Sequence, residues 1–174
     1  MNQLWRWFFR FVVTIGLLCA AFMMLLVFGM SRPSVSQSDG FIDRTSDAID
    51  CTISHQLPES AEQIRYLRAS VGLGGRLRIY RFTAPVADLH QHAIAEFDAH
   101  WHRPGYLAKP NAASPFEPRD VKLIADFCGA SAEWLLPPAN ASGTIYEPAD
   151  GESSHRPIIF VDEINSVLYF RMTD

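Results

Sequence analysis

A stretch of twenty residues without one charged side chain, residues 11–30, is the feature that most constrains this chain. As an α-helix, a stretch of this length spans roughly 30 Å, which matches the hydrocarbon thickness of a bilayer. A helix that is apolar on every face needs lipid or a large protein core to cover it. The sequence therefore predicts a transmembrane helix over residues 11–30, preceded by a cytoplasmic tail over residues 1–10.

Charged and aromatic residues beside the apolar run predict its orientation. Arg6 and Arg10 precede the run. Trp5 and Trp7 lie beside them, and such rings favour the headgroup region. Basic residues mark the cytoplasmic side, so we expect residues 31–174 to lie outside the cytoplasm, as in the periplasm of a bacterium. The alternative is a cleaved signal peptide, but its apolar core is usually about 7–15 residues, and this run is longer.

Composition changes after the apolar run. Residues 31–47 are rich in Ser, Asp and turn-forming residues, which predicts a flexible linker. Residues 48–174 are long enough to form one compact domain. The net charge of the chain is −4, and an acidic chain lacks the basic surface that nucleic-acid binding requires. We therefore expect no nucleic-acid partner. The predicted anchor makes the membrane a partner, and we expect an unknown protein as a second one.

Two cysteines, Cys51 and Cys128, lie in the predicted domain. In an oxidising compartment they could form one disulfide, and the alternative is a pair of separate buried thiols. The chain has no CxxC pair, so these cysteines do not follow the spacing of a zinc site.

Apolar patterning predicts an α+β domain made of two β-hairpins and one main helix. The expected elements are strands over 64–71 and 76–83, a helix over 85–101, a short helix over 121–127 capped by Asp120, and strands over 144–146, 158–161 and 167–172. The remaining parts of 103–120 and 129–156 are expected to be loops. The result is a two-layer sandwich, in which the main helix covers an antiparallel sheet.

Arginines interleaved with aromatic residues on the first hairpin are the first candidate site. The set consists of Arg65, Arg68, Arg76, Arg78 and Arg81, with Tyr66 and Tyr80 as the expected exposed aromatic residues. Guanidinium groups bind carboxylate and phosphate well, and basic groups near a membrane favour anionic lipid. The alternative is a solvated edge hairpin, whose charges discourage pairing with other chains.

A row of polar residues on the main helix is the second candidate site. His92, Glu96 and His100 follow at four-residue steps, and we expect them roughly opposite the apolar stripe. Imidazole and carboxylate are zinc ligands, but the row spans about 12 Å of helix, so one ion could reach only an adjacent pair. The alternative is a solvated polar face.

No motif indicates a catalytic centre or a cofactor. Gly72-Leu73-Gly74-Gly75 lacks the spacing of a dinucleotide-binding loop, and no G-x-S-x-G nucleophile motif is present. We therefore expect a membrane-anchored, non-enzymatic binding or accessory module. A metal-binding protein or metal-dependent enzyme, and a structural envelope protein, are the alternatives.

Several short segments are similar to those of small bacterial exported and membrane-anchored proteins of unknown function. The segments are Leu57-Pro58, Ser60-Ala61, Ile64, Arg81-Phe82, Ala84-Pro85, Trp134 and the last hairpin around Asp162. The resemblance covers about 100 residues and implies a small extracytoplasmic domain. It implies no catalytic residue.

Overall fold

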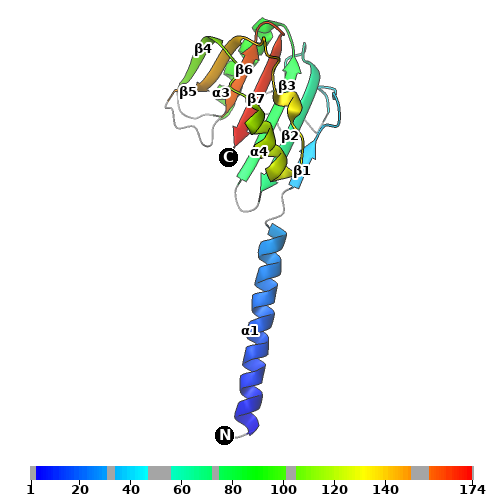
Figure 1. Ribbon diagram of the computed structural model, residues 1–174, viewed down its shortest axis with the longest axis vertical. Helices are drawn as coiled ribbons and strands as arrows, with labels where there is room; N and C mark the ends of the chain where they lie inside the picture. Colours follow the sequence, from blue (N-terminus) through cyan, green and yellow to red (C-terminus); the bar gives the residue numbers. More distant parts are fainter. Residues whose placement is uncertain are drawn as a thin grey trace.

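A computed structural model of the chain describes residues 3–30, 34–46, 56–71, 75–100, 105–149 and 157–173. One long helix stands apart from a domain built on a β-sheet (Figure 1). The elements are α1 (Gln3–Met30), β1 (Ser34–Gln37), β2 (Glu62–Val71), β3 (Gly75–Thr83), α3 (Val86–His100), β4 (Tyr106–Ala112), α4 (Pro118–Cys128), the 3₁₀ helix η1 (Glu133–Leu135), β5 (Gly143–Pro148), β6 (Ile158–Asp162) and β7 (Val167–Thr173). They confirm the predicted α+β class.

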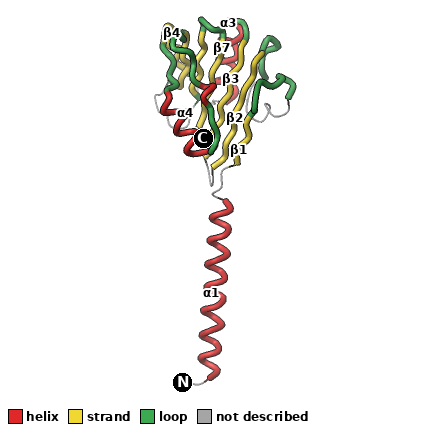
Figure 2. Tube along the Cα trace, turned by 45° about the vertical axis from the view of Figure 1, so that its right-hand side comes forward, coloured by secondary structure: helices red, strands yellow, loops and turns green. Residues whose placement is uncertain are grey.

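The long helix α1 is clear of the domain in both views (Figures 1 and 2). Its segment Trp5–Val27 is long and apolar enough to cross a membrane, and its most apolar stretch is not buried against other described residues. The helix begins at Gln3, so residues 3–10 of the predicted tail are helical as well. Large side chains such as Phe22 and Leu25 are exposed, and a contiguous apolar surface of this kind marks a membrane or protein contact.

Seven strands form one antiparallel sheet in the order β1-β2-β3-β7-β6-β5-β4. Both predicted hairpins are confirmed. Val71 pairs with Gly75 in the first, and Asp162 pairs with Val167 in the second. The hairpins meet at the centre of the sheet, where Tyr80 on β3 lies opposite Phe170 on β7.

The predicted flexible linker is partly a strand. Ser34 to Gln37 pair with β2, and Ile42 forms a further bridge with Ile64. The sequence does not predict this strand, because its side chains are all exposed and it therefore lacks an apolar alternation. The strand is held instead by backbone pairing at the edge of the sheet.

One predicted loop contains a strand, and one predicted strand is longer than expected. β4 lies within the expected loop 103–120, and β5 extends the short strand expected at 144–146. Pro110 within β4 argued against a strand, but β4 is the other edge of the sheet, where proline is tolerated.

Hydrophobic cores lie on both faces of the sheet. On one face α3 places Leu89, Ala93 and Phe97 in a core with Tyr80 and Phe170. The other face has a second core, formed by residues of β2, β3, β6 and β7 with residues of α4, η1 and the segment before α4. The expected sandwich of sheet and main helix therefore gains a third layer, because strand residues of both parities are apolar at the sheet centre.

The start of α4 differs from the expectation. Glu117 occupies the N-cap, and Pro118 follows in the first turn. The Asp120 carboxylate accepts the backbone N–H of Glu117 at 2.8 Å, so Asp120 supports the cap from inside the helix. Gly129 ends the helix with a φ of +68°, a conformation that glycine adopts without steric cost.

Candidate functional site

Two members of the polar row of α3, His92 and Glu96, face the sheet and not the solvent. His92 is 3 % exposed and Glu96 is fully buried, so the expectation that they form a solvated face was wrong. They follow the core residue Leu89 by three and seven positions, which places all three on one side of a helix. The side chain of His100 is outside the described residues.

His92 contacts aromatic residues of β3. Its Nε2 lies 3.1 Å from the hydroxyl of Tyr80, and its ring meets the ring of Phe82 edge-on at 5.1 Å between centroids. Burial raises the pKa of Tyr80 well above its usual value, the negative charge of Glu96 adds to the shift, and Arg78 opposes it. Among the described residues, no group of three His, Cys, Asp or Glu could hold a metal ion.

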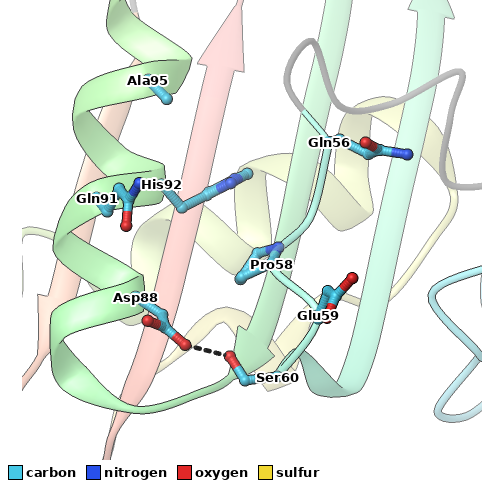
Figure 3. A pocket seen from close by; sticks show the side chains of 8 residues that line it. All are labelled: Gln56, Pro58, Glu59, Ser60, Asp88, Gln91, His92 and Ala95. Carbon is cyan, nitrogen blue, oxygen red and sulfur yellow. Dashed lines mark hydrogen bonds between the residues drawn. The ribbon is translucent and has the colours of Figure 1, made fainter.

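A pocket of about 400 Å³ opens between α3 and the turn before β2 (Figure 3). The Ser60 hydroxyl donates to Asp88 at 2.5 Å across one end of the pocket, and Glu59 and His92 also line it. In a hydrolytic triad the histidine stands between the serine and the acid. Here Ser60 contacts Asp88 directly, which ties the turn to α3, while His92 bonds to Tyr80 and so links α3 to β3.

A second histidine, which the sequence patterns did not single out, joins three elements. His90 Nδ1 lies 2.7 Å from the Tyr146 hydroxyl on β5, and its Nε2 lies 3.5 Å from the carboxylate of Glu163. The hydroxyl of Thr144 donates to the same carboxylate at 2.7 Å. Burial, and after it the nearby Tyr106 and Glu163, raise the pKa of Tyr146. The network fastens α3 to β5 and to the turn between β6 and β7.

Strand alternation divides the five candidate arginines between the two faces of the sheet. Arg68, Arg76 and Arg78 share the face of Tyr66 and Tyr80, on the side of α3. Both tyrosines are buried, so the expectation that they are exposed was wrong. Of the five arginines, only Arg76 is classed as exposed.

Arg65 and Arg81 lie on the opposite face, among aromatic rings. They are Cα partners on β2 and β3. The guanidinium of Arg65 lies 5.6 Å from the ring centre of Trp134 and 6.0 Å from that of Phe41. That of Arg81 lies 5.9 Å from Phe41 and 5.8 Å from Tyr169. We call these five residues the arginine–aromatic cluster.

The donors of the cluster are only partly used. Arg81 Nη1 donates to the backbone carbonyl of Trp134 at 3.4 Å. The Nε atoms of Arg65 and Arg81 are buried and have no hydrogen-bond partner within the described ranges. The sequence did not signal the aromatic members, because Phe41 lies in the predicted linker and Trp134 in a predicted loop. The predicted cysteine pair cannot be placed here, since Cys51 and the side chain of Cys128 are outside the described residues.

No protein-family model, curated protein or solved structure matches this chain in comparisons of sequence and fold.

Proposed function

We propose that this chain is a single-pass membrane protein whose α+β domain is a non-enzymatic binding or accessory module. The observation that carries the proposal is α1, whose apolar segment Trp5–Val27 is exposed along its length and long enough to span a bilayer. Lipid is the covering that such a surface fits best, because no described part of the domain packs on it.

The junction after α1 supports a domain held close to the bilayer. Helix α1 ends at Met30 and β1 begins at Ser34, and four residues span at most about 14 Å. The edge strand is therefore confined near the headgroups. A partner in the same membrane then meets the domain at a high effective concentration, so that a weak contact suffices for binding.

The exposed chemistry of the domain supports recognition over catalysis. Arginine and aromatic side chains dominate the energetics of many protein interfaces, and both gather in the arginine–aromatic cluster. Phe41, the outermost member, is 60 % exposed. Among the described residues that line the pocket beside α3, Ser60 hydrogen-bonds to Asp88 and not to a histidine.

The proposal includes an orientation, with the N-terminus in the cytoplasm and the domain outside. Arg6 and Arg10 at the start of the chain support it. Protease added to intact spheroplasts that express the chain should digest the domain. Protection until the membrane is permeabilised would reverse the orientation.

Membrane fractionation tests the anchor. Full-length chain should stay in the membrane pellet after an alkaline carbonate wash, with its mass unchanged. The double variant Leu17→Arg/Leu18→Arg should move to the supernatant, because charges at the helix centre are costly in lipid. The control Leu17→Ala/Leu18→Ala should stay in the pellet. Wild-type protein in the supernatant, or a mature form without α1, would refute the anchor.

Photo-crosslinking tests the binding module. A photoreactive phenylalanine at position 41 should give discrete adducts in intact membranes. The matched control is the same residue at position 123, since Leu123 on α4 is 63 % exposed and lies outside the cluster. Identical adducts at both positions, or none at position 41, would count against recognition through the cluster.

A further inference from the structure

We infer that the arginine–aromatic cluster binds an oxyanion, the carboxylate or phosphate group of a soluble ligand. The inference deepens the proposed binding module by naming the chemistry that it recognises, and it rests on that function. Its basis is the juxtaposition of two guanidinium groups with buried donors and aromatic walls.

Two like charges lie opposite each other in the cluster. Arg65 and Arg81 are direct cross-strand partners on one face of the sheet. Side chains in such positions start about 5 Å apart, and like charges there repel each other. An anion between or beside the two groups removes that repulsion.

The arginines on this face of the sheet differ in whether a carboxylate neutralises them. In the part of the chain that the structure describes, no carboxylate forms an ion pair with Arg65 or Arg81. Arg171, the arginine of β7 on this same face, provides a contrast. It lies over the ring of Phe116 and also pairs with Asp120 at 2.8 Å. Among the described residues, a carboxylate therefore pairs with Arg171 on this face, and none pairs with the two arginines of the cluster.

The hydrogen-bond donors of the two guanidinium groups are not all satisfied by the described residues. The Nε–H groups of Arg65 and Arg81 are buried, and no described residue accepts a hydrogen bond from them. Buried polar groups of folded proteins are almost always hydrogen-bonded, so two such donors side by side call for a ligand. A guanidinium presents its donors along its edge and its flat faces to aromatic rings, and this fork suits the oxygens of carboxylate and phosphate.

The position of the cluster identifies a soluble ligand over lipid of the same membrane. Ser34 at the membrane end of β1 pairs with Ser70, and Arg65 lies five residues before Ser70 in β2. At about 3.3 Å per residue, the cluster is roughly 16 Å beyond that end of the sheet. A ligand in solution reaches this end more easily than a headgroup does, and Phe41 of the cluster is exposed there.

Arginine side-chain NMR of the full chain in non-ionic detergent tests the inference. The Nε–H resonances of selectively ¹⁵N-labelled arginine are followed at constant pH and ionic strength, with sodium phosphate, sodium acetate or sodium chloride added. Arg65 and Arg81 should shift saturably with phosphate or acetate, and exposed Arg76 should not. A response to phosphate alone identifies a phosphate ligand, and a response to acetate alone a carboxylate ligand. Equal shifts of all arginines, shifts with chloride alone, or no shift would overturn the inference.

Conservative variants provide a second readout. Arg65→Lys and Arg81→Lys keep the charge but remove the fork, and each should weaken binding of the active anion at least tenfold. Arg76→Lys is the matched control and should leave binding unchanged. Unchanged binding in both cluster variants would overturn the inference, even with wild-type shifts. These measurements use detergent, so their failure would leave the membrane anchor standing, and loss of the anchor would not alter anion binding.

Discussion

The buried Tyr80–His92 hydrogen bond is the internal contact with the clearest measurable consequence. Tyr80 has no exposed surface, and its ring stacks on Phe170 with centroids 4.4 Å apart. The variant Tyr80→Phe keeps this packing and removes only the hydroxyl that lies 3.1 Å from His92 Nε2. Loss of one partner of a buried hydrogen bond costs about 1–3 kcal/mol of unfolding free energy. We expect that loss at pH 7.

The same hydroxyl makes the effect depend on pH. Burial raises the pKa of Tyr80, so the folded protein keeps this proton after the unfolded chain, with an ordinary tyrosine pKa of about 10, has lost it. Above pH 10 the unfolded state binds fewer protons than the native state, and stability therefore falls as pH rises. The loss reaches about 1.4 kcal/mol at pH 11 for one group. The variant lacks this group, so its deficit relative to wild type should shrink by about that amount between pH 7 and pH 11.

Urea unfolding of the full chain in detergent, followed by tryptophan fluorescence at both pH values, measures the two deficits. The pKa values of Tyr146 and Tyr169 are raised as well, mainly by burial, but both groups are present in either protein and cancel in the comparison. Tyr66→Phe is the control at pH 7, and it should cost only about 0.5–1.5 kcal/mol, because its hydroxyl makes a longer, partly exposed contact of 3.3 Å with Ser36. A Tyr80→Phe deficit that is equally large at pH 11 would refute the reasoning from burial.

Three further substitutions probe the sheet and its helix, each by urea unfolding of the full chain. Gly143→Ala should destabilise by about 3 kcal/mol or more, since the added Cβ would lie 1.8 Å from the carbonyl oxygen of Val161, while Gly40→Ala, with open space around it, should be close to neutral. Asp162→Ala should cost about 2–3 kcal/mol, because its buried carboxylate accepts three N–H bonds that order the turn after β6. Leu89→Ala should cost about 2–5 kcal/mol by opening a cavity under α3.

The elements that the sequence predicts correctly are those whose signal is local. The hairpin of β6 and β7 has apolar, β-branched runs on both sides of a turn, and α3 has an apolar stripe with helical spacing. The strands that it misses, β1 and β4, are edge strands with largely exposed side chains. Each is held by the neighbouring strand, and the sequence of the edge strand alone carries no mark of that pairing.

The site residues show a similar limit. The histidine and glutamate of α3 are polar, and polar residues are mostly exposed, so a solvated face was the natural expectation. Their helical phase beside Leu89 placed them inward, and the hydroxyl of Tyr80 supplies a partner for His92. The burial of His92 thus depends on Tyr80, a partner twelve positions earlier in the chain. Such a partner is visible only once the strand and the helix are packed together.

The direction of β2 determines how far each arginine of the first hairpin lies from α1. The strand runs away from Arg65 toward the end where Ser70 pairs with Ser34, just after α1. Arg76 is therefore at the end of the sheet next to α1, on the α3 face, whereas Arg65 and Arg81 lie further from α1 on the other face. Substitution of all five arginines together would mix two environments. In the proposed module only Arg65 and Arg81 bind the soluble ligand. Substitution of either one should therefore weaken anion binding, and substitution of the other three arginines should not.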